Sequence, residues 1–216
     1  MTTIYKNFIS LGWFCGVAAS MKKYGLRSFS GPFDWYFSEW GGVISCIENR
    51  FEDFLSKENL EKVPDSKAFQ DLKYGFVFNH EITHSLEADY EYIRDKYNRR
   101  IALFLEKIKE RTCFIRAVRH PKEIEYIAQN CDYINFLIKR DNPENEIIYL
   151  VLDHFRLPVA LQDAHNIYQL NIHKYNGERK ELDKLFDQSP LFLQWCREHS
   201  EEQMRKRNLI FSSSLD

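Results

Sequence analysis

The sequence predicts an α/β fold, with a mainly parallel sheet flanked by helices in a single layered domain over residues 1–216. Three observations lead to this prediction. Short apolar runs alternate with longer segments whose apolar residues recur at helical spacing, as they do when helices join parallel strands. Residues 146–152 are almost continuously apolar, which is typical of a central parallel strand covered on both faces. The chain is also long enough to bury one sizeable core.

The first elements surround a glycine. The apolar run at residues 5–11 predicts a strand, and residues 14–23 predict a helix, with Gly12 at the turn between them. Residues 27–35 are rich in serine, glycine and proline, and their interleaved aromatic residues indicate an ordered loop packed on the body of the protein.

Helical spacing dominates the next part of the chain. Apolar residues recur in this way over residues 38–55, and again over residues 87–111, where a long helix is expected. Residues 56–68 are polar and predict a surface loop. Residues 72–78 predict a short strand between that loop and the long helix.

The last part repeats the alternation of strand and helix. A strand is expected over residues 113–118, and a helix over residues 121–139 that begins with proline in its first turn. The central strand at 146–152 follows. Residues 167–172 predict one more strand, and residues 181–207 predict mostly helix, interrupted near a proline.

Composition excludes several classes of protein. The net charge is −2 and no basic stripe is present, which argues against a nucleic-acid-binding protein. No secretory signal is recognisable, and no run approaches the roughly 20 apolar residues of a membrane span. The five cysteines are scattered and form no CxxC pair, so neither a disulfide framework nor a zinc knuckle is expected. We therefore expect a cytoplasmic protein without metal or cofactor; its oligomeric state stays open.

Cys15 is the first candidate for chemistry. A strand that turns on Gly12 into a helix places this thiol at the helix N-terminus, where unpaired N–H groups and the helix dipole favour an anion. A thiol there is expected to have a lowered pKa and an enriched nucleophilic thiolate. The alternative is that Cys15 is a buried small apolar residue, which is common for cysteines.

Other polar residues follow the predicted strands. In an α/β sheet the active site lies beyond the carboxyl ends of the strands, and this rule brings one set of residues to one edge: Cys15, His80, Arg116 or Arg119, Asp153 and His154. His80 and His154 are the candidate bases, since each follows an apolar run. Asp153 next to His154 gives an alternative catalytic pair, as in an esterase-like enzyme.

The loop at residues 27–35 contributes candidate binding groups. Arg27 and Arg116 are suited to grip a carboxylate or phosphate through paired hydrogen bonds. Asp34 either orients a histidine or caps a helix that starts after it. A non-catalytic alternative has this loop, with Ser30 and Trp35, holding a sugar or an anionic ligand while Cys15 is structural.

Residues 79–84 contain His-Glu-x-x-His, from His80 to His84. On a helix this spacing points both histidines at one zinc ion, with the glutamate as general base. The β-branched Ile82 and Thr83 disfavour a helix here, and no third ligand is evident. The zinc enzyme is therefore the weaker alternative.

Two blocks of the sequence resemble a known family. The likeness continues through shorter segments and covers residues 8–120 in all. The matching strings are Ser10-Leu11-Gly12-x-x-Cys15, Leu26-Arg27-Ser28-x-Ser30-x-Pro32-Phe33-Asp34-Trp35, Phe51-Glu52-Asp53-Phe54, His80, Lys96-Tyr97-Asn98-Arg99-Arg100-Ile101 and Phe114-Ile115-Arg116. The chain thereby resembles an uncharacterised bacterial family of putative papain-like cysteine peptidases.

The resemblance implies a hydrolase with Cys15 as nucleophile, His80 as its base and Asp34 as the acid that completes the set. It implies a peptide substrate. An acyl or glycan substrate, for an esterase or acyltransferase linked to bacterial surface polysaccharide, is the alternative that the resemblance also allows.

Overall fold

The computed structural model describes residues 3–171, 179–201 and 205. Its main sheet is parallel throughout. Each strand of this sheet is hydrogen-bonded to the next in the order β1 (Asn7–Ser10), β5 (Thr112–Val118), β6 (Glu146–Leu152) and β7 (Ile167–Leu170). In the register of the sheet Ile9 lies opposite Phe114, and Phe114 opposite Ile147. The predicted α/β fold with a mainly parallel sheet is confirmed.

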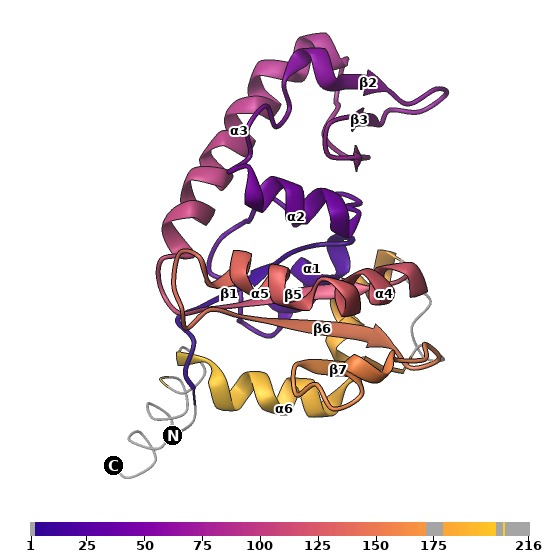
Figure 1. Cartoon of the computed structure of the whole chain (residues 1–216). Helices are drawn as coiled ribbons and strands as arrows, with labels where there is room; N and C mark the ends of the chain where they lie inside the picture. Colours follow the sequence, from indigo (N-terminus) through magenta and orange to yellow (C-terminus); the bar gives the residue numbers. More distant parts are fainter. Residues whose placement is uncertain (1–2, 172–178, 202–204, 206–216) are drawn as a thin grey trace.

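The side chains of each strand point alternately to the two faces of the sheet, so that an apolar cluster forms on each face. Helices cover both clusters. Cys113 and Ile115 point into one cluster, and Phe114 and Val118 into the other. The first cluster is closed by α1 (Cys15–Lys23) and α6 (Pro190–His199), and the second by α2 (Trp40–Glu48), α4 (Pro121–Gln129) and α5 (Cys131–Lys139). Figure 1 shows α6 and α2 on opposite sides of the strands.

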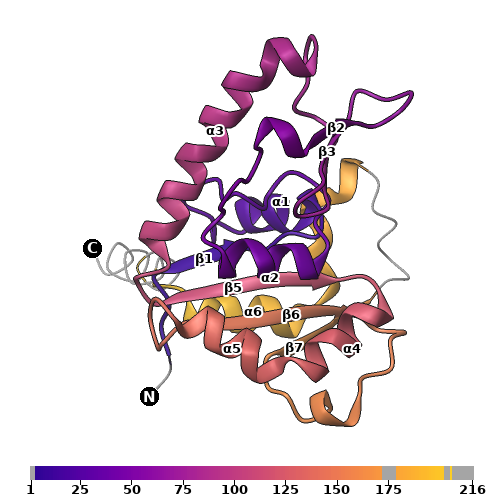
Figure 2. The ribbon, with the colours of Figure 1, turned by 45° about the horizontal axis from the view of Figure 1, so that its top comes forward.

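A second, antiparallel sheet lies away from the first. It consists of β2 (Leu60–Lys62), β3 (Phe69–Asp71) and β4 (Phe76–Phe78). Figures 1 and 2 show it beside the far end of the long helix α3 (Leu86–Lys107). The sequence prediction of a plain surface loop at 56–68 is therefore wrong. That segment is too polar to reveal strand β2, which is held by backbone pairing with β3.

Two helices end earlier than their apolar spacing predicts. α2 stops at Glu48, and Arg50, Phe51, Asp53 and Leu55 take left-handed φ angles between 55° and 62°. Phe51 and Leu55 are buried all the same, so the aromatic spacing that resembles a helix comes from a packed turn. Similarly, the helix expected over 121–139 is divided into α4 and α5 at Asn130.

The C-terminal part keeps its predicted order. The structure has 3-10 segments at Lys57–Asn59, Val159–Leu161 and Arg179–Gln188, the last of which precedes α6. Residue 172 of the predicted strand, and residues 202–204 and 206–207 of the predicted helix, lie outside the described residues. Within the part of the chain that is described, no helix has both the length and the hydrophobicity of a membrane span.

Candidate functional site

The turn after β1 brings Cys15 to the start of α1. Gly12 has φ +76°, and a Cβ at this position would lie 2.6 Å from the Phe33 carbonyl oxygen and 2.7 Å from Ser38 Oγ. Trp13 follows with φ +86°, a left-handed conformation that is strained for a residue with a large side chain. Such strain persists only where surrounding contacts impose it, and it often marks functional sites. The tight turn leaves Cys15 as the first residue of α1.

Ser38 and Arg116 hold this turn in place. The Trp13 N–H donates to Ser38 Oγ over 3.0 Å. Arg116 is fully buried, and its guanidinium donates to the Leu11 carbonyl oxygen, Ser38 Oγ and the Ser38 carbonyl oxygen over 2.8–3.0 Å. Its Nε donates to Glu123 Oε1 over 2.7 Å. Four protein acceptors thus surround Arg116, which we predicted as a substrate-binding group.

Cys15 itself is half-buried, and its side chain packs against the apolar cluster on the α1 face of the sheet. This burial raises the pKa of the Cys15 thiol, while the N–H of its own backbone has the opposite, smaller effect. The expectation of a lowered pKa is therefore wrong for this conformation. The helix start supplies one donor to the thiolate, and the apolar surroundings outweigh it.

This environment leads to a labelling prediction. We expect iodoacetamide to modify Cys15 and Cys131, both half-buried, and to spare the buried Cys46, Cys113 and Cys196 in the native protein. The rate at Cys15 should rise about tenfold per pH unit up to a pKa above the ordinary thiol value, since only the thiolate reacts. Peptide mass mapping after labelling between pH 6 and 10 measures this. A reactive plateau at pH 6 would show a preformed thiolate and contradict it.

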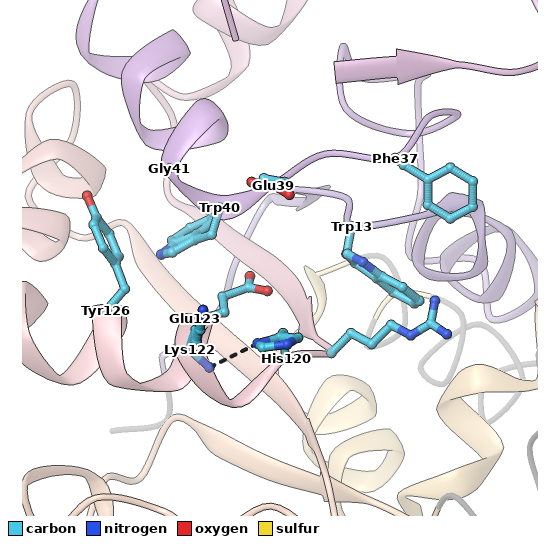
Figure 3. Close-up of a pocket in the computed structure, with 10 residues that line it drawn as sticks. Trp13, Phe37, Glu39, Trp40, Gly41, His120, Lys122, Glu123 and Tyr126 are labelled. Atoms are coloured by element: carbon cyan, nitrogen blue, oxygen red, sulfur yellow. Dashed lines mark hydrogen bonds between the residues drawn. The ribbon is translucent and has the colours of Figure 1, made fainter. Parts of the chain in front are cut away.

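A pocket of about 570 Å³ opens at the carboxyl ends of β1 and β5. Figure 3 shows Trp13 and Phe37 at one end of it, Trp40 and Tyr126 at the other, and His120 and Glu123 between them. The Arg119 guanidinium lies 4.5 Å from the centre of the Trp13 ring. Since Trp13 is two residues before Cys15, the pocket and the thiol share the same turn.

His120 is a candidate base that sequence reasoning missed. It follows β5, the strand next to β1, and is exposed at the pocket. Its Nδ1 accepts from the Lys122 N–H over 3.2 Å, so Nε2 is the ring nitrogen left for a substrate. The rule that gathered other residues at the carboxyl edge applies equally to His120, and would have identified it.

His80 comes from the antiparallel sheet and not from the parallel one. It is exposed and lies two residues after β4. Backbone hydrogen bonds nevertheless tie β4 to the site, because Val77 pairs with Phe37 in both directions and the Ser38 N–H donates to the Trp13 carbonyl oxygen. No hydrogen bond joins His80 to Cys15 among the described residues.

The His-Glu-x-x-His string does not form a helix. Glu81 binds Lys96 and accepts from the Tyr97 hydroxyl, and His84 Nδ1 lies 3.1 Å from Asp89 Oδ1. Within the described ranges no group of three His, Cys, Asp or Glu side chains is arranged to hold a metal ion. The geometry of a helical zinc site is therefore not formed by this segment.

Asp34 organises the loop at 27–35. Its carboxylate is buried and accepts from Arg27 over 2.6 Å and from the Gly31 N–H over 2.8 Å. Burial raises the pKa of Asp34 to about 6, although Arg27 favours its ionised form. Arg27 also donates to Ser30 Oγ and stacks at 5.0 Å on the Trp35 ring. The four predicted loop residues thus form one cluster, in which Asp34 holds Arg27.

Asp153 and His154 follow β6, as predicted, with 3.8 Å between Asp153 Oδ1 and His154 Nδ1. His154 lines a different pocket of about 730 Å³, together with Phe155, Arg156 and Pro121. β5 separates β6 from β1 in the sheet. Two strand spacings of about 4.8 Å therefore lie between the ends of β1 and β6, and the pair is farther from the turn at Trp13 than His120 is.

Comparison with known proteins gives two matches. The profile of a family described as "putative papain-like cysteine peptidase" matches residues 6–154. An uncharacterized protein of Acanthamoeba polyphaga mimivirus is 25% identical to this chain in an alignment that covers 81% of this chain and 92% of the viral protein. No solved structure matches the chain.

Proposed function

Because the chain belongs to the family of putative papain-like cysteine peptidases, we propose that it is a cysteine-dependent hydrolase of peptide bonds with Cys15 as its nucleophile. One observation carries this proposal: a half-exposed thiol is the first residue of a helix that starts from a strained turn at the carboxyl end of a parallel strand. Active sites of α/β proteins form at this edge. An esterase or acyltransferase would use the same nucleophile.

The first turn of α1 supplies donors for the reaction. Phe14, the residue before the helix, makes no side-chain cap, so within the described part of the chain the Gly16 N–H is left for an oxyanion. The Cys15 N–H joins it once Sγ has bonded to the substrate. The N–H groups of Gly12 and Trp13 are not available, because they donate to Ser10 Oγ and Ser38 Oγ. Gly12 and Trp13 therefore hold the turn in position. The N–H groups at the start of α1 donate to the oxygen of the reacting carbonyl.

The proposed hydrolysis starts from the Cys15 thiol, whose pKa is raised. Cys15 Sγ attacks the substrate carbonyl carbon as a histidine removes its proton. The tetrahedral intermediate then expels the amine, which takes that proton. Water, deprotonated by the same histidine, hydrolyses the thioester and returns the thiol and a carboxylic acid. Since burial raises the pKa of the Cys15 thiol and favours its protonated form, the base must act during the attack.

We propose His80 as that base. The paired backbone of Val77 and Phe37 supports this choice, because it carries the end of β4 to the segment that holds Trp13. Asp34 acts in the proposal by holding Arg27, beside Ser30 and Trp35, where a substrate carboxylate would be gripped. His120 at the pocket, and His154 with Asp153, are the alternatives.

Single substitutions of the three histidines by asparagine test the assignment. A base contributes about 10²–10⁴-fold to turnover. We expect this loss in kcat/KM for His80→Asn, measured on a fluorogenic peptide library and on thioesters, and less than threefold for His154→Asn. His165→Asn, outside the candidate site, is the control. If His120→Asn alone loses activity, His120 is the base and the assignment of His80 is overturned.

A further inference from the structure

The pocket beside Trp13 carries groups that the proposed hydrolysis does not use. Its cationic lining residues are Arg119 and Lys122, both exposed. Its carboxylates are Glu39, which is exposed, and Glu123, which is bound to the buried Arg116. His120 is also in the lining. Because Arg116 balances Glu123, the remaining charges leave one positive charge in excess, and this favours an anionic ligand.

Aromatic surface accompanies these charges. Phe37 is 46% exposed and lies 6.2 Å, centre to centre, from the Trp13 ring. Tyr126 and Trp40 form the opposite end of the pocket (Figure 3). Exposed aromatic side chains next to a cation are suited to a flat ring that carries a negative charge, since the ring stacks and the charge is paired.

The start of α2 also faces this space. Glu39 makes no side-chain cap, and Gly41 lines the pocket with nothing within 4 Å of the position of a Cβ. Among the described residues, no side chain therefore forms a hydrogen bond with the N–H groups of this first turn. In addition, Trp40 is 97% buried, yet its indole N–H has no acceptor among the described residues, and Figure 3 shows that nitrogen on the side of Tyr126. A ligand oxygen would satisfy the N–H groups of this turn, and it would reach the enclosed indole N–H after a shift of the Trp40 ring.

We propose that this pocket is a binding site for a small oxyanion, phosphate or carboxylate, attached to a planar ring. Arg119, Lys122 and the first turn of α2 bind the oxyanion. The ring lies against Trp13 and Phe37. Binding does not require the Cys15 thiol, so the site is independent of the proposed catalysis.

Titration of the full chain with defined probes tests this site. Two of the four tryptophans line the pocket, so their fluorescence reports binding, and calorimetry gives the affinity. We expect phenyl phosphate or benzoate to bind at least tenfold more tightly than inorganic phosphate or neutral benzyl alcohol. Comparing phenyl phosphate with benzoate shows whether the site prefers a phosphate or a carboxylate. Equal affinity for all four probes, or no binding of either ring anion, would overturn the proposal.

Gly41→Asp separates loss of binding from loss of folding. Aspartate in the first turn of α2 is favourable for the helix, yet its carboxylate projects into the open pocket and repels an anion. We expect an unchanged or higher melting temperature and at least tenfold weaker binding. Arg119→Gln should also weaken binding. Lys139→Gln, which removes an exposed charge from the last turn of α5, should change affinity less than twofold.

Cys15→Ala distinguishes the two proposals. It should keep full affinity for the ring anion while it loses hydrolysis. If Gly41→Asp and Arg119→Gln bind the probes as tightly as the unmodified protein, the ligand occupies another part of the surface and this site is refuted, whatever the outcome for hydrolysis.

Discussion

Cys15→Ala is expected to lower kcat/KM for peptide or thioester hydrolysis by about a thousandfold or more, because no other group replaces an attacking thiolate. Stability should change little. The side chain is half-buried at the start of a helix, where alanine is compatible with the backbone. We expect the free energy of unfolding, measured by urea denaturation, to change by no more than about 1 kcal/mol. Incubation of the unmodified protein with a thioester should also give an acyl adduct on Cys15 by mass spectrometry.

The chain offers a matched control in Cys131. This residue is also half-buried and is also the first residue of a nine-residue helix, α5. It lies after α4 rather than after a strand. Cys131→Ala should therefore leave hydrolysis unchanged. If Cys15→Ala retains full activity, or if both variants lose it equally, Cys15 is not the nucleophile.

Arg116→Met is expected to destabilise the protein by about 3–5 kcal/mol, as the removal of one partner from a buried ion pair commonly does. Glu123 would keep a carboxylate that is only 10% exposed and has lost its cation. Leu11 and Ser38 would lose the donors that link β1 to the start of α2. Burial raises the pKa of Glu123 even with Arg116 present. Urea unfolding followed by circular dichroism measures the change.

A second substitution separates the lost charge pair from simple loss of packing. In Arg116→Met/Glu123→Met neither buried charge remains, and we expect the double variant to be more stable than Arg116→Met alone. Arg94→Ala removes an exposed arginine that pairs with Glu91 one turn away on α3, and should cost less than about 0.5 kcal/mol. A change in Arg116→Met as small as that of Arg94→Ala would show that Arg116 does not hold the site together.

Local patterns were enough to predict most of the parallel sheet. β6 is an apolar run bounded by polar residues, and β1 runs into a glycine that the turn requires. β4 illustrates the limit. Its three residues are apolar like those of the other strands, but its partner is β3. Strand pairing depends on contacts between distant segments, which the local spacing of apolar residues does not encode.

The same limit applies to the site. The sequence itself determined that Cys15 follows a glycine turn at the start of a helix, because both the turn and the helix are local. Tertiary structure decided the environment of the thiol, since the apolar cluster that raises its pKa comes from strands and helices far along the chain. It also decided that Arg116, with its planar charged group, is enclosed by Leu11, Ser38 and Glu123. Which acceptors surround a long side chain depends on packing, and packing is fixed only when the whole sheet has formed.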